Sequence, residues 1–131
     1  MKRLVLFLIV LGVLVYQLPE PGPDAAVPGA RWQAKAIGIA AGYWQSSCQV
    51  KVKWAAMPPR VLGQSVVGAC LDDGRGTEKL AFALTREKWG VQCATVVHEE
   101  GHLLGLGHSH NPYNIMYPVI TGRNIPNACR R

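Results

Sequence analysis

The sequence lacks internal repeats and low-complexity tracts, and it is short of acidic residues. Its 131 residues include eight Asp and Glu against fourteen Lys and Arg, so the formal net charge is +6 and the isoelectric point about 9.4. The cations are scattered, with no basic block interleaved with aromatic residues, which argues against nucleic-acid binding. A mild attraction to acidic cell surfaces is compatible with the charge. The length excludes more than one domain.

Long hydrophobic runs are also scarce, and the one present lies at the N-terminus. Residues 4–18 carry no charge and follow Lys2 and Arg3. This pattern predicts that residues 1–18 are a signal peptide or an uncleaved signal-anchor, with a stiff Pro/Gly/Ala-rich linker over 19–30. The run is shorter than the ~20 residues of a membrane span, but no clean cleavage site follows it. In either case we expect residues 31–131 to be exported, and thus secreted or held at the membrane.

The four cysteines include no closely spaced pair, which argues against a four-cysteine zinc site. An even number in an exported chain predicts two disulfides, with three possible pairings. We favour Cys48–Cys70, joining neighbouring strands, and Cys93–Cys129, tying the C-terminal tail to the start of a helix.

Hydrophobic periodicity predicts two main helices and a small sheet. Apolar residues at helical spacing indicate a helix over 32–46, and strict alternation indicates a half-buried strand over 48–55. We expect further strands over 65–71 and 78–85, the latter near the sheet edge, with a loop between them over 72–76. A second helix over 91–104 ends at Gly105, and an irregular segment follows to the C-terminus. The fold class is therefore α+β, with a mixed twisted sheet.

All four histidines lie within residues 98–110, and three of them have the spacing of metal ligands. His98 and His102 are one helical turn apart on the same face, so both imidazoles can bind one zinc ion. Gly105 allows a sharp turn out of the helix, which brings His108 back to the metal. Three protein ligands with one open position are typical of catalytic zinc, whereas His110 has no place in the pattern and is assigned to the surface.

Glu99 follows the first ligand and is predicted to be the catalytic residue. Its carboxylate can reach a water at the open zinc position and take its proton, as a general base must. Glu100 points about 100° further round the helix and has no assigned role.

The segment HEEGHLLGLGH fits the pattern HExxHxxGxxH and resembles the metzincin zinc peptidases. His108-Ser109, Pro112 and Ile115-Met116-Tyr117-Pro118 further resemble the matrix metalloproteinase (matrixin) branch. The resemblance covers residues 33–118 and is specific over 98–118. It implies a small metzincin-like domain in which Met116, in the Met-turn, forms an apolar floor beneath the zinc.

This sequence departs from the family's pattern at several positions. The regions that hold a second, structural zinc in the family contain no histidine here, so we expect one catalytic zinc ion. Calcium is possible at Asp72, Asp73 and Glu78, but a solvated acidic turn is the favoured interpretation. Ile120 stands where the family has a tyrosine, which bears on the substrate pocket.

Together these features predict a monomeric zinc endopeptidase that acts on extracellular proteins or peptides, without nucleic acid and with a possible N-terminal membrane tether. The substrate would pair with the edge strand around residues 80–85. One alternative is an exported zinc-binding surface module without catalytic turnover. Another is a membrane-anchored interaction protein whose histidines are incidental.

Overall fold

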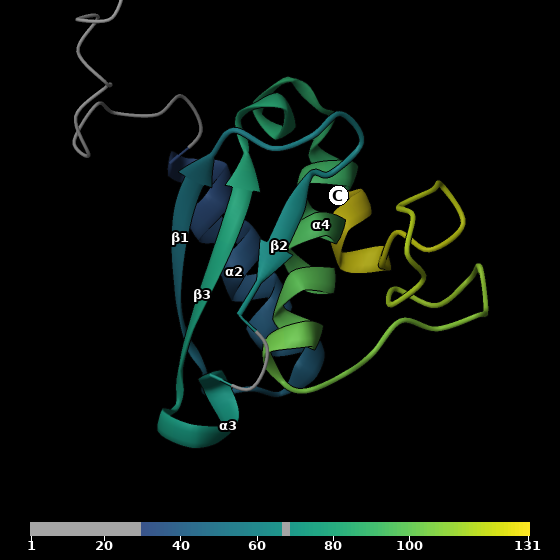
Figure 1. Ribbon diagram of the computed structural model, residues 1–131. Helices are drawn as coiled ribbons and strands as arrows, with labels where there is room; N and C mark the ends of the chain where they lie inside the picture. The colour runs from purple at the N-terminus through teal and green to yellow at the C-terminus, as the bar shows by residue number, and fades with distance from the viewer. Residues whose placement is uncertain (1–29, 67–68) are drawn as a thin grey trace, which may run out of the picture.

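A computed structural model describes residues 30–66 and 69–131 (Figure 1). The predicted signal segment over 1–18 and linker residues 19–29 lie outside the described residues. In the described parts, no helix is both long and apolar enough to cross a bilayer. The elements, in chain order, are α2 (Ala30–Trp44), β1 (Gln49–Ala55), β2 (Gly63–Ser65), α3 (Ala69–Asp73), β3 (Arg75–Ala81), η1 (Phe82–Arg86), α4 (Trp89–Leu103) and η2 (Asn127–Arg130).

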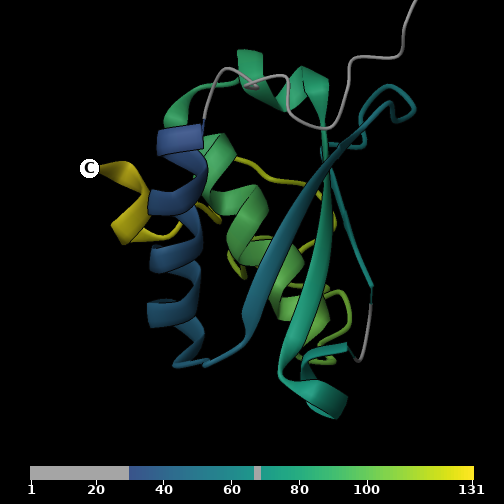
Figure 2. The ribbon, with the colours of Figure 1, turned by 90° about the vertical axis from the view of Figure 1, so that its left-hand side faces the viewer.

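The two long helices, α2 and α4, cover the same face of the sheet (Figures 1 and 2). The helical spacing expected for the first helix is confirmed, because Ala36 and Ala40 are fully buried against α4. The Trp44 indole then donates a hydrogen bond of 2.8 Å to the carbonyl of Val97. Small residues on α2 and this indole fix the position of α4.

Three strands form a mixed sheet in the order β1-β3-β2. β1 pairs with β3 in parallel, and β2 pairs with β3 antiparallel. The alternation expected for residues 48–55 is confirmed in β1. The expectation that the strand over 78–85 lies near the edge is wrong: β3 is central, spans 75–81, and gives way to η1. Lys79 of β3 is exposed because one face of the sheet is open to solvent. A lysine in this strand therefore did not indicate that the strand lies at the edge of the sheet.

The strand expected over 65–71 is also wrong. β2 ends at Ser65, and Ala69–Asp73 form the short helix α3. A short apolar run does not distinguish strand from helix by periodicity alone. The expected loop over 72–76 shrinks accordingly, because Gly74, at φ +72°, makes the turn and β3 begins at Arg75.

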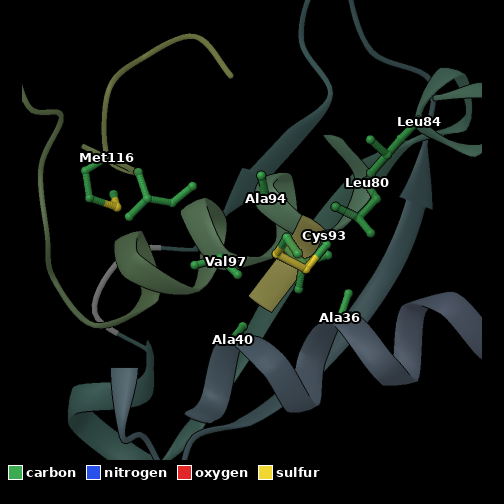
Figure 3. Packing of buried hydrophobic residues seen from close by; sticks show 11 residues of the cluster. Ala36, Ala40, Leu80, Leu84, Cys93, Ala94, Val97 and Met116 are labelled. Atoms are coloured by element: carbon green, nitrogen blue, oxygen red, sulfur yellow. A yellow bond between two sulfur atoms is a disulfide. The ribbon is translucent and has the colours of Figure 1, made fainter. Parts of the chain in front are cut away.

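Both predicted disulfides are present, Cys48–Cys70 and Cys93–Cys129. The first joins the segment before β1 to α3, and not two strands as expected. The second links η2 to the first turns of α4 and lies inside the core beside Ala36, Leu80 and Val97 (Figure 3). The predicted α+β class, with two main helices and an irregular C-terminal segment, is confirmed.

Candidate metal centre and active site

Helix α4 carries the first two histidines and ends in a motif that returns the chain toward them. The amide of Leu106 donates to the carbonyl of Gly101 at 3.0 Å, and the amide of Gly105 donates to the carbonyl of His102 at 2.9 Å. These two bonds form a Schellman motif, which requires the left-handed φ of +85° found at Gly105. The chain therefore reverses immediately after the helix, as the sequence predicted.

The Nε2 atoms of His98, His102 and His108 converge on one point. The Nε2 atom of His102 lies 3.0 Å from that of His98 and 3.2 Å from that of His108. Tetrahedral zinc with bonds of 2.0–2.1 Å separates its nitrogen ligands by roughly 3.3 Å. The three imidazoles therefore have the spacing and donor chemistry that one zinc ion needs.

Backbone carbonyls orient two of these imidazoles. Nδ1 of His98 lies 2.7 Å from the carbonyl oxygen of Ile115, and Nδ1 of His102 lies 2.7 Å from that of Leu106. Each carbonyl can accept a hydrogen bond from Nδ1–H, which leaves the Nε2 lone pair directed at the common point. Burial also lowers the pKa of His98, which favours the neutral form that binds metal. Neither carbonyl was identifiable from sequence, since each depends on the path of the loop after Gly105.

Glu99 lies beside this centre and packs against the edge strand β2. Its side chain is nearly buried. Burial raises the pKa of Glu99 to about 7, while a hydrogen bond with Ser65 of β2 opposes the shift. A Cβ atom on Gly63, also in β2, would lie 2.7 Å from Cγ of Glu99. Gly63 and Ser65 thus hold the carboxylate from the sheet side, and no sequence motif identified either residue.

Met116 packs against α4 between the two histidine ligands. A Cβ atom on Gly101 would overlap Sδ of Met116 and would lie 3.0 Å from Cζ2 of Trp44. The carbonyl of Met116 accepts a hydrogen bond of 2.8 Å from the amide of Ser109, one residue after His108. The Met116 segment therefore contacts α4 and the third histidine's loop together.

A pocket of about 540 Å³ opens next to Glu99. Two of the histidines, His98 and His108, share its wall with Glu99. The remaining lining is mostly apolar and comes from β2 and the loop before it, from α4 and from the irregular segment: Arg60, Val61, Leu62, Gly63, Thr95, Pro118, Val119 and Ile120. Ile120, where a tyrosine was expected from the resemblance, is one of these lining residues. His110 is exposed, as predicted.

Two more carboxylates lie behind the site, and the sequence interpretation did not predict that either is buried. Glu78 of β3 and Glu100 of α4 are both 0% exposed, and none of their carboxylate oxygens makes a hydrogen bond among the described residues. Burial raises the pKa of Glu78 well above its usual value, and repulsion by Glu99 and Glu100 adds to the shift. The expectation that Glu78 belongs to a solvated acidic turn is wrong. Side chains alternate along β3, and that of Glu78 points toward α4. Asp72 and Asp73 are exposed at the end of α3.

Comparison with protein families shows that the matrixin model matches residues 31–128, which is most of the chain. The chain belongs to the matrixin family. Comparison with curated proteins found no match, and comparison with solved structures found none. The α+β fold and the three converging histidines agree with the matrixin assignment, which places the protein in a family of zinc metalloproteases.

Proposed function

We propose that this matrixin is a zinc-dependent endopeptidase in which His98, His102 and His108 hold one zinc ion and Glu99 is the general base. The observation that carries the proposal is that Glu99 shares a pocket with His98 and His108. Zinc bound there would polarise a scissile carbonyl and acidify water. Glu99 would accept the proton of the attacking water and pass it to the leaving amine.

The environment of Glu99 suits a base that takes up and releases a proton. Burial raises its pKa to about 7 before the charge of any metal is counted, and a bound cation would lower it again. A general base works best when its pKa lies near the operating pH. The contacts with Gly63 and Ser65 limit where the carboxylate can move.

The substrate would bind as an extended peptide along β2. The expectation that the substrate pairs with the strand around residues 80–85 is wrong, because β3 already has a neighbouring strand on each side. β2 is an edge strand, and its first residue, Gly63, lines the pocket. A peptide added to this edge would place one apolar side chain among Val61, Leu62 and Ile120.

We also propose that the enzyme acts outside the cytoplasm on protein or peptide substrates. The two disulfides support this, because such bonds persist in oxidising compartments. The apolar run over 4–18 is consistent with export as a signal peptide or signal-anchor. The chain would act as a monomer with one zinc ion.

A pair of variants tests the assignment of the base. Glu99→Ala should retain about one zinc per chain, measured by elemental analysis, because the three imidazoles remain. Its kcat/KM on a peptide library should fall by a factor on the order of 10²–10⁴, the usual contribution of general acid–base catalysis. Glu100→Gln, one position along α4, should bind zinc and cleave peptides nearly as the wild type does.

The outcomes separate the proposal from its alternatives. If both variants cleave like the wild type, Glu99 is not the base. If the wild type binds zinc tightly but cleaves no peptide, with or without chelator, the chain is a zinc-binding module without turnover. If His98→Ala, His102→Ala and His108→Ala all leave the zinc content unchanged, the converging histidines are incidental.

A further inference from the structure

Among the residues of the three strands, those on the face opposite the helices include three lysines and no carboxylate. Helices α2 and α4 both lie on the other face, and no described segment covers this one (Figures 1 and 2). Lys51 and Lys53 of β1 and Lys79 of β3 are exposed on it, and we call these three residues the lysine face. The other side chains that point outward from the strands are three uncharged residues and one arginine: Gln49, Gln64, Thr77 and Arg75.

The lysine face brings like charges together within the fold. Lys53 lies directly opposite Lys79 in the β1–β3 register, and like charges at paired positions are destabilising. Lys51 precedes Lys53 by two residues on the same face of β1, which separates their Cα atoms by roughly 6.6 Å. The charges therefore spread over two strands as a planar array. Such an array is suited to a flat anionic surface, which would neutralise several charges at once.

Aromatic side chains gather where β1 and β3 end, on the side of the sheet that faces the helices. Trp54, which follows Lys53, stacks with Phe82 at a centroid distance of 6.0 Å and contacts Trp32 edge-on at 6.0 Å. Phe82 is 48% exposed. Trp32 belongs to the first turn of α2, with which the described part of the chain begins. Because side chains alternate along a strand, Trp54 points to the face opposite Lys53, so these rings are not part of the lysine face.

We propose that the lysine face docks this domain onto an anionic phospholipid bilayer. The planar charge array, in a chain whose sequence also carries an apolar run over 4–18, favours a lipid surface over a soluble polyanion. The pocket opens between β2, α4 and the C-terminal segment, away from the lysine face, so a docked domain keeps its pocket accessible. Docking does not depend on the peptidase activity proposed above.

The test compares binding of the full chain to vesicles of phosphatidylcholine alone and of phosphatidylcholine mixed with phosphatidylglycerol. The apolar run contributes to both partition coefficients, so their ratio isolates the effect of lipid charge. The face variant carries Lys51→Gln, Lys53→Gln and Lys79→Gln. The matched control carries Lys88→Gln, Arg123→Gln and Arg131→Gln, which remove equal charge from exposed positions outside the strands. Circular dichroism and thermal unfolding check that both variants fold.

We expect the face variant to reduce this ratio by a factor on the order of a hundred, since each lysine near an anionic surface contributes about fivefold. The control variant should keep most of the wild-type ratio, and added salt should remove the difference between them. An equal fall in both variants would show that net charge alone acts, which overturns the proposal. An unchanged ratio in the face variant, with lost retention on immobilised heparin, would instead assign the face to a soluble polysaccharide.

Discussion

Glu99 owes its position to a residue that has no side chain. Gly63 of β2 packs so closely that a Cβ atom there would lie 2.7 Å from Cγ and 2.9 Å from Oε1 of Glu99. Real Cβ contacts are longer, so any larger residue must displace the carboxylate or the strand. The placement of the proposed base is therefore shared between α4 and the sheet edge.

Gly63→Ala should lower kcat/KM by about 10- to 100-fold, because a shift of roughly 1 Å in a catalytic group has effects of that size. Zinc content should stay at the wild-type level, since the three atoms nearest to a Cβ at Gly63 belong to Glu99 and Thr95 and not to a histidine. Gly122→Ala is the control, because a Cβ atom at Gly122 meets nothing within 4 Å. If Gly63→Ala cleaves peptides at the wild-type rate, β2 does not position Glu99.

The buried carboxyl of Glu78 makes stability depend on pH. Because burial, and then repulsion by Glu99 and Glu100, raise its pKa, the folded chain keeps a proton that the unfolded chain loses above about pH 4.5. Stability should thus be greatest below that pH and should fall as pH rises through the folded-state pKa. Glu99 and Glu100, with pKa values raised to about 7, act in the same direction.

Glu78→Gln should stabilise the chain at pH 8 by roughly 1–3 kcal/mol, because the buried site then holds a neutral group. Urea unfolding at several pH values, with chelator present so that metal uptake does not contribute, measures this. The variant's stability should fall less steeply with pH than that of the wild type. Parallel curves for the two proteins would mean that Glu78 takes up no proton on folding.

At the scale of elements, the two long helices use glycine for different reasons. Gly38 of α2 is exposed, and a Cβ atom there meets nothing within 4 Å. Gly101 of α4 lies against Met116 and Trp44, so the helix can approach the Met116 segment only without a side chain. Gly101, between the first two histidine ligands, is therefore required by packing, whereas Gly38 in α2 is not.

Gly38→Ala should raise the free energy of unfolding by roughly 0.5–1 kcal/mol, the helix-interior difference between the two residues. Gly101→Ala should lower it by roughly 1–3 kcal/mol through overpacking. Urea denaturation of both variants gives the comparison. A stabilised Gly101→Ala would show that the Met116 segment does not pack tightly on α4.

At the scale of the whole molecule, the two disulfides hold the ends of a small core together. Cys48–Cys70 closes a sequence separation of 22 residues and Cys93–Cys129 one of 36. Loop-closure entropy assigns roughly 3–4 kcal/mol to each bridge. Cys93 and Cys129 are also fully buried in the main hydrophobic cluster, whereas Cys48 and Cys70 are only half-buried.

Replacing Cys93 and Cys129 together by alanine should therefore destabilise the chain more than replacing Cys48 and Cys70. The entropy lost is similar in the two cases, but only the first pair leaves a cavity in the core. Thermal unfolding with zinc-loaded protein compares them. An equal loss would mean that chain entropy alone accounts for both bridges.

Local patterns in the sequence were sufficient for features that depend on neighbouring residues. Helical spacing predicted α2 and α4, and strict alternation predicted β1. The histidines four apart, with Gly105 and His108 beyond them, predicted a three-imidazole site, because helix geometry and a left-handed glycine place them with little help from the rest of the chain.

Only the tertiary structure decided features that depend on which segments meet. β3 is central because β1 and β2 both pair with it, and residues 69–73 are helical in a run whose apolar pattern fits either structure. The contact of Gly63 with Glu99 and the burial of Glu78 against α4 join residues far apart in sequence. No local pattern records such contacts, because packing between a sheet and a helix is set by the whole fold.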